Sequence, residues 1–184
     1  MIDRLAALAR ADGLWHPRDC AAGTELFALA EPSSQFWILE RGLIKLGYLT
    51  ANGEDWIKSF IVDQGLFTGS GDLSPDGTNR YGATCLEPSR VAALPLAWVG
   101  RQIEESATLQ GDFVRFAAWL QARKQRREEL LLCASAEQRY RDLLEQDGAL
   151  AARLRQAYIA RYIGITPIAL SRIRRRMGLS GKAA

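Results

Sequence analysis

Short apolar runs separated by glycine and proline turns fill the first half of the chain. Four runs have the length of strands: residues 36–39, 43–49, 56–62 and 91–94. Asn52-Gly53 lies between two of them and predicts a hairpin, because Asn-Gly readily adopts the positive φ angles of a tight turn. Helix is expected at residues 96–105. Many short strands joined by tight turns favour a small antiparallel barrel or jelly roll.

A long helix is predicted for residues 109–134. Its apolar positions are spaced by 4, 3 and 4 residues, as in a heptad stripe: Leu109, Phe113, Phe116 and Leu120. Such a helix can pack on its own domain or be shared between two subunits, and the pattern favours dimerisation. The basic cluster at residues 123–127 continues the register. It requires acids, such as Glu128 and Glu129 of a partner subunit, to balance it.

Two short helices joined by a glycine turn are predicted towards the C-terminus. Gly164 suits the left-handed backbone of such a turn. Thr166 can cap the second helix, and Pro167 fits its first position because proline has no N–H to leave unpaired. The apolar positions expected to face inward are Ile159, Ile163, Leu170, Ile173 and Met177. A further helix is expected to start at Ser135, where Gln138 completes a capping box.

Charge separates the two ends of the chain. The formal net charge is +3, but residues 139–184 hold ten Lys/Arg against three Asp/Glu, a balance of +7 that leaves −4 for the rest. A basic helix after a glycine turn is typical of a helix-turn-helix whose second helix enters the major groove of double-stranded DNA. The candidate DNA-binding residues are Thr166, Ile168, Ser171, Arg172, Arg174, Arg175 and Arg176. Arg172 is expected to read guanine, and Arg174 to Arg176 to contact phosphates.

Other functional classes find little support. The three cysteines lie far apart without CxxC spacing, and His16 is the only histidine, so no metal or iron–sulfur site is predicted. No catalytic motif occurs, and an enzyme is not expected. The chain shows no apolar run of membrane-spanning length and no signal peptide. With 48% hydrophobic and 24% charged residues, a globular protein of the reducing cytoplasm is expected.

A family resemblance agrees with this pattern. Residues 158–175, YIARYIGITPIALSRIRR, resemble the helix-turn-helix of the Crp/Fnr superfamily of bacterial transcription regulators. Residues 36–45, FWILERGLIK, the turn at 52–54 and residues 60–67 are similar to the cyclic-nucleotide-binding-like domain of that family.

The resemblance implies an α+β chain of three parts. These are a sensor domain over residues 1–108, a dimerisation helix over 109–134 and a DNA-binding domain over 135–184. It also implies a homodimer on a two-fold-related operator. RNA polymerase and a small-molecule effector are the further partners that the resemblance allows.

The sequence departs from the family pattern in the sensor domain. Nucleotide-binding members hold the ribose and cyclic phosphate with a Gly-Glu pair and a later Arg-Ser pair, but here the first pair reads Gly69-Ser70. The second region reads Asn79-Arg80-Tyr81, in which Arg80 can still pair with a phosphate. These five residues are the candidate ligand-binding positions. Because the ribose-binding carboxylate is absent, no cofactor is expected and cyclic nucleotide is not the expected effector.

The DNA-binding domain departs as well. Ile168 stands where family members often place a base-reading Glu, whereas Arg172 matches the usual base-contacting Arg. Seven residues follow Met177, so a truncated or absent wing is expected. The alternative from another class is a ligand-binding or protein-interaction module with a non-specific basic tail.

Overall fold

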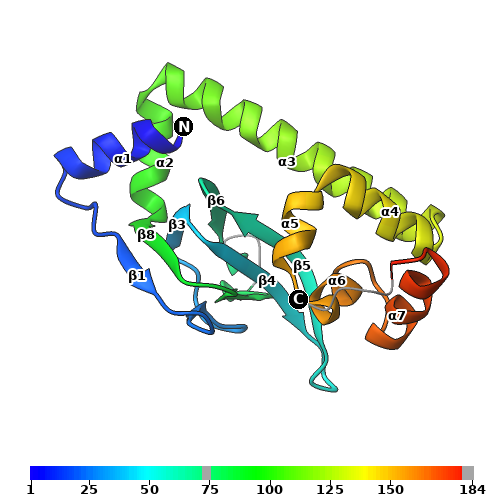
Figure 1. Ribbon diagram of the computed structural model, residues 1–184. Helices are drawn as coiled ribbons and strands as arrows, with labels where there is room; N and C mark the ends of the chain where they lie inside the picture. Colours follow the sequence, from blue (N-terminus) through cyan, green and yellow to red (C-terminus); the bar gives the residue numbers. More distant parts are fainter. Residues whose placement is uncertain (72–75, 180–184) are drawn as a thin grey trace. The chain divides into compact units, whose positions relative to one another are not determined.

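The computed structural model describes residues 1–71 and 76–179. The chain divides into two compact units. The first holds the residues up to Trp119 except Asp55–Ile57, and the second holds Asp55–Ile57 together with the described residues from Leu120 onward. Helix α3 (Ala107–Cys133) is continuous and contributes to both (Figure 1). The predicted helix at 109–134 is therefore present. None of the helices in the described part of the chain is long and apolar enough to cross a membrane.

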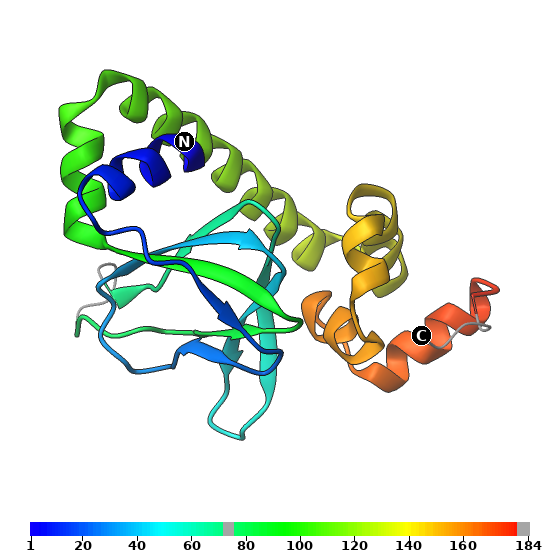
Figure 2. The same cartoon turned by 60° about the vertical axis from the view of Figure 1, so that its left-hand side comes forward.

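Two four-stranded antiparallel sheets form most of the first unit. One sheet has the order β1 (Arg18–Cys20), β8 (Ser89–Pro95), β3 (Gln35–Arg41) and β6 (Gly65–Thr68), and the other has β2 (Glu25–Phe27), β7 (Gly82–Cys85), β4 (Leu43–Leu49) and β5 (Asp55–Val62). The four predicted strands correspond to β3, β4, β5 and β8. Within the described residues the two sheets share no ladder and form two layers (Figure 2), so of the predicted barrel or jelly roll a closed barrel is not found.

Aromatic side chains fill the space between the two sheets. Four rings, contributed by or adjacent to strands of both sheets, contact one another: Phe27, Trp37, Phe67 and Tyr81. The ring centroids of neighbouring pairs lie 6.0–6.4 Å apart. All four are buried in one cluster with aliphatic neighbours. Offset and tilted rings at this spacing add to the area that they bury, so these contacts stabilise the packing of one sheet on the other.

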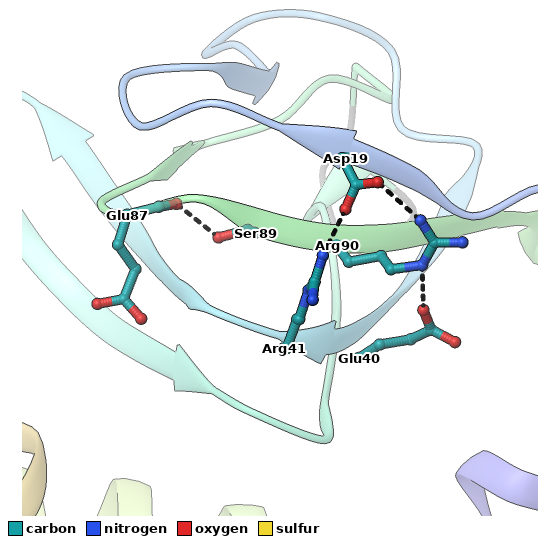
Figure 3. Close-up of polar contacts among 6 residues, drawn as sticks. All are labelled: Asp19, Glu40, Arg41, Glu87, Ser89 and Arg90. Atoms are coloured by element: carbon teal, nitrogen blue, oxygen red, sulfur yellow. Dashed lines mark hydrogen bonds and ion pairs between the residues drawn. The ribbon is translucent and has the colours of Figure 1, made fainter.

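A tight turn after β3 passes the chain from one sheet to the other. Gly42 has φ +115°, and a Cβ there would lie 2.2 Å from the Ser89 hydroxyl oxygen. That hydroxyl donates to the carbonyl of Glu87 at 2.8 Å (Figure 3). Only glycine allows this approach.

An ion-pair network ties three strands of the first sheet together at its surface. Asp19 of β1 accepts from Arg41 of β3 at 2.9 Å and from Arg90 of β8 at 2.8 Å, and Arg90 also donates to Glu40 at 2.9 Å (Figure 3). The hydrogen bond from Arg41 lowers the pKa of Asp19. Because Asp19 and Arg41 are exposed, the network orients side chains more than it adds to the free energy of unfolding.

Three helices cover one side of the first unit. Helices α1 (Ile2–Ala11) and α2 (Leu96–Glu105) pack with the start of α3 around a second apolar cluster. Asp112 of α3 pairs with the amino group of Met1 at 3.1 Å and with Arg4. Hydrogen bonds from these two groups hold the pKa of Asp112 at about 2.

Leu109 belongs to this cluster and is only 1% exposed. Phe116 packs against the same cluster from its edge, whereas Phe113 is 41% exposed. The heptad stripe predicted for dimerisation therefore divides within the single chain. Leu109 serves the core of its own domain, and Phe113 faces outward.

Short helices follow α3 in the second unit: α4 (Ala136–Gln146), α5 (Gly148–Arg153), α6 (Gln156–Tyr162) and α7 (Pro167–Arg176). The predicted capping box opens α4, because the amide of Gln138 donates to the Ser135 hydroxyl at 3.3 Å and the amide of Ser135 donates to the Gln138 side chain at 2.8 Å. Asp147 ends α4, and Gly148 begins α5 directly after it.

The basic cluster of α3 finds acids within the same chain. Arg126 pairs with Asp142 of α4, and Arg123 lies 3.5 Å from the carboxylate of Asp147. For these two arginines, intramolecular acids take the place of the partner-subunit acids, such as Glu128 and Glu129, that the sequence suggested. These pairs connect α3 to the helices that follow it.

Candidate nucleic-acid interface

Helices α6 and α7 pack as a helix-turn-helix. Their inner faces bury Ile159, Ala160, Ile163, Leu170 and Ile173, while Met177 is partly buried. Gly164 has φ +75°, and the amide of Ile165 donates to the carbonyl of Ala160 at 3.0 Å, which closes the turn. A Cβ on Gly164 would also lie 3.1 Å from a methyl carbon of Leu131. The predicted turn, and the glycine that it requires, are confirmed.

The start of α7 is fixed by local contacts. The Thr166 hydroxyl accepts from the amide of Ala169 at 3.2 Å, and Pro167 occupies the first helical position. No acidic residue lies in the first turn. The positive end of the helix dipole therefore remains available to an anion such as a DNA phosphate. Thr166 acts here as the cap, as its place in the sequence predicted.

One face of α7 points away from the packed interior. Its members follow the helical spacing i, i+3, i+4 and i+7 and are all exposed: Ile168, Ser171, Arg172 and Arg175. The buried Leu170 and Ile173 lie on the opposite face. In the part of the chain that the structure describes, no ion pair or hydrogen bond joins the guanidinium of Arg172 or Arg175 to another group. Both cations are available to a polyanion. We call these four residues the outward face of α7.

Arg174 and Arg176 are engaged within the protein. The guanidinium of Arg174 donates to the Tyr140 hydroxyl at 2.7 Å and to the carbonyl of Leu179 at 3.0 Å. Arg176 pairs with Glu137 of α4 at 3.2 Å. The sequence grouped Arg174 and Arg176 with Arg175 as phosphate partners. The structure separates the three, because Arg174 and Arg176 connect α7 to α4.

Arg139 is a positioning residue that the sequence pattern did not reveal. Its guanidinium donates to the carbonyl of Ile163 at the end of α6, at 2.8 Å, and to the carbonyl of Ala134 after α3, at 2.7 Å. Carbonyls at helix ends lack partners within the helix, so one cation here satisfies two ends at once. The available signal was only a basic residue near a capping box.

The five candidate ligand-binding positions of the first unit lie together, and four of them bond to neighbouring protein groups. The amide of Ser70 donates to the side chain of Asn79 at 3.0 Å, and the Ser70 hydroxyl accepts from the amide of Arg80 at 2.7 Å. Asn79 is buried, and a Cβ on Gly69 would lie 1.9 Å from its side-chain oxygen. The polar groups of Ser70 and Asn79 thus bond to the protein itself.

Tyr81 and Arg80 have protein partners as well. The Tyr81 hydroxyl donates to the carbonyl of Thr68 at 2.8 Å, and burial raises the pKa of Tyr81 to about 12. The Arg80 guanidinium lies 3.5 Å from the carboxylate of Asp76. Within residues 1–71 and 76–179, no three His, Cys, Asp or Glu side chains gather as metal ligands would.

The middle of α3 carries exposed apolar side chains beside the buried ones. Val114 is 64% exposed, and Phe113 and Trp119 are exposed too, while Leu120 is partly covered. Trp119 stacks on Phe116 with ring centroids 5.8 Å apart. The prediction of a truncated or absent wing after Met177 concerns mainly residues 180–184, which lie outside the described residues.

No family model and no curated protein matches the chain by sequence. Solved structures do match. FixK2 from Bradyrhizobium japonicum is 18% identical, with a TM-score of 0.75 over 92% of this chain and 89% of that one. The c-di-GMP responsive global regulator CLP of Xanthomonas campestris is 14% identical, with a TM-score of 0.72 over 98% and 95%.

A third match is a protein from Eubacterium rectale assigned by its description to the crp/fnr family of transcriptional regulators. It is 13% identical, with a TM-score of 0.73 over 98% of this chain and 86% of that one. The shared fold thus extends over nearly the whole length of this chain and of those proteins.

Proposed function

We propose that this chain, which has the fold of Crp/Fnr regulators, is a DNA-binding transcriptional regulator that acts as a homodimer on a two-fold-related operator. The outward face of α7 carries the proposal. It places side by side, on a capped helix and opposite a buried apolar face, two arginines whose guanidinium groups have no partner among the described residues. A helix of this kind enters the major groove with its N-terminal residues towards the base edges.

Within that face the two arginines have different roles. The guanidinium of Arg172, one turn into the helix, gives two hydrogen bonds to guanine O6 and N7, a pairing worth about 1–3 kcal/mol against the wrong base. Arg175 lies one turn further from the N-terminus and contacts phosphate, which adds affinity without sequence preference. Thr166 stands at the start of α7, where the backbone amides and the helix dipole favour the binding of a phosphate.

The homodimer is proposed to form through the exposed apolar part of α3. Phe113 and Val114 are uncovered in the single chain, and burying them against a second copy would remove their apolar surface from water. Two copies of α7 related by two-fold symmetry require half-sites about 10 base pairs apart, or a multiple of that. By binding there the dimer would alter the access or activity of RNA polymerase.

The effector, where one acts, is proposed not to be cyclic AMP. Ser70 stands at the position where a ribose-binding carboxylate would be expected, and its hydroxyl already accepts from the amide of Arg80. A neutral hydroxyl also lacks the charge that roughly doubles hydrogen-bond strength. The aromatic cluster between the sheets also supports the proposal that cyclic AMP is not the effector, because its buried rings already contact one another.

Retention on duplex DNA across a salt gradient, followed by selection from a random duplex pool, tests the proposal. A sequence-specific regulator enriches a two-fold-related motif and still binds it at salt concentrations that release random duplex. A module with a merely basic tail is released from all duplexes alike and enriches no motif. That second outcome would contradict the proposal.

A further inference from the structure

An isoleucine stands on the outward face of α7 among polar and charged neighbours. Ile168 is 68% exposed, although Leu170 and Ile173 of the same helix are buried. Ser171 and Arg172 follow it at i+3 and i+4 and share its face. Ile168 is therefore directed towards the same partner as Arg172, and not towards the protein interior.

The local structure gives this side chain a fixed direction. Ile168 is the second residue of α7, immediately after Pro167, where the hydrogen bond from the Ala169 amide to Thr166 holds the backbone. A β-branched side chain in a helix has one strongly preferred χ1 rotamer, and it leans towards the helix N-terminus. Ile168 thus presents a stiff aliphatic surface at the end of α7 that enters the groove first.

The chemistry of the major groove selects the contact. An aliphatic side chain offers no hydrogen bond, so it gains nothing from the donors and acceptors of base edges or from phosphate oxygens. Among the base edges exposed in the groove, thymine alone carries an apolar group, its C5-methyl. We infer that Ile168 is a specificity-determining residue that contacts a thymine methyl in each half-site. The inference rests on the proposed function.

The position of that thymine follows from helix geometry. Ile168 and Arg172 are four residues apart, which is about 6 Å along the helix axis. Successive base pairs are about 3.4 Å apart along the duplex. The thymine therefore lies within about two base pairs of the guanine that Arg172 reads.

Uracil substitution isolates the methyl group. Each thymine of the selected half-site is replaced in turn by uracil, which lacks only the C5-methyl, and the dissociation constant is measured for the wild type and for Ile168→Ala. The wild type is expected to lose about fourfold in affinity at one thymine per half-site, the size expected for one buried methyl group. Ile168→Ala is expected to bind the thymine and uracil duplexes equally at that position.

Arg175→Ala is the matched control, because Arg175 lies on the same face and is assigned to phosphate. It is expected to bind more weakly overall yet to keep the fourfold uracil penalty. Ile168→Ala will fold, since the side chain is exposed and alanine favours helix, and circular dichroism verifies this.

Two results would overturn the inference while leaving the proposed function intact. In one, the protein enriches a motif, but uracil has the same effect on the wild type and on Ile168→Ala at every position. In the other, the motif has no thymine within about two base pairs of the guanine assigned to Arg172. Failure to enrich any motif would overturn the proposed function as well.

Discussion

Arg174 is expected to hold α7 in place through Tyr140, and its removal should loosen that helix without removing a DNA contact. The guanidinium donates to the Tyr140 hydroxyl at 2.7 Å, and Tyr140 is only 1% exposed. Arg174→Ala therefore leaves a buried hydroxyl without its partner. Tyr140→Phe removes the hydroxyl itself and leaves a partly exposed guanidinium that water can reach.

The magnitudes differ for these two changes. An unsatisfied buried hydroxyl costs about 1–3 kcal/mol, whereas deleting one hydrogen bond together with its buried group costs about 0.5–1.5 kcal/mol. In Arg174→Ala with Tyr140→Phe the unsatisfied group is gone. The double variant should therefore lose no more stability than Arg174→Ala alone, which is a coupling of about 0.5–1.5 kcal/mol between the two positions.

Amide hydrogen exchange across α7 measures this coupling locally. Exchange of the α7 amides in Arg174→Ala should be faster by about fivefold to 150-fold, as about 1–3 kcal/mol of local opening free energy implies. The salt dependence of DNA binding gives the second readout. Arg175→Ala should lower the slope by about one unit per protomer bound, and Arg174→Ala should leave it unchanged.

Two results would refute this reasoning. Additive effects of Arg174→Ala and Tyr140→Phe on exchange would show that the two groups do not act together. A salt slope that falls as much for Arg174→Ala as for Arg175→Ala would show that Arg174 contacts a phosphate.

Three further predictions concern assembly, pH and the effector. Val114→Glu should give monomers by sedimentation at micromolar concentration, whereas Arg101→Glu on α2 should stay dimeric; a monomeric wild type would contradict the α3 interface. A hydrogen bond from the amino group of Met1 is the main cause that holds the pKa of Asp112 at about 2 in the folded chain, below its ordinary value of 3.8. The ionised carboxylate of Asp112 therefore stabilises the fold. That contribution should be complete above about pH 4 and disappear as the pH falls towards 2, and Asp112→Asn should flatten this part of the urea-unfolding profile; an unchanged profile would contradict it. Calorimetry with cyclic AMP should show no binding at micromolar ligand, and a micromolar or tighter dissociation constant would refute that expectation.

Local signals in the sequence predicted the parts of the site that depend on local geometry. Gly164 was identified because a turn between two helices requires a backbone that glycine adopts at little cost. Thr166 and Pro167 marked the start of α7 for equally local reasons, since a cap and a first-turn proline act on amides within three residues. The capping box at Ser135 belongs to the same class.

Contacts between distant residues could not be read in the same way. Arg174, Arg175 and Arg176 are equivalent in the sequence, and only the packing of α4 against α7 assigns Tyr140 to the first and Glu137 to the third. A heptad stripe likewise records that positions are apolar but not what covers them. Leu109 and Phe113 share the stripe, yet one lies in the core and the other is exposed.

The sequence pattern left a barrel and a jelly roll as alternatives for a related reason. Strand lengths and turns follow from local alternation, but closure of a barrel depends on which strands pair across the fold. Here β3 and β4 are joined by the Gly42 turn and yet belong to different sheets. The lengths and positions of the apolar runs alone do not determine at which turn the chain passes from one sheet to the other.

The central claim is that α7 reads DNA sequence and that Arg172 is its guanine-reading residue. Selection from one random duplex pool with the wild type and with Arg172→Ala, under the same salt conditions, tests it most directly. We predict that the wild type enriches a two-fold-related motif with guanine at one position of each half-site. Arg172→Ala should bind more weakly and lose the preference at that position alone. Enrichment of the same motif, unchanged at every position, by Arg172→Ala would contradict the assignment, and no enrichment by the wild type would contradict the function.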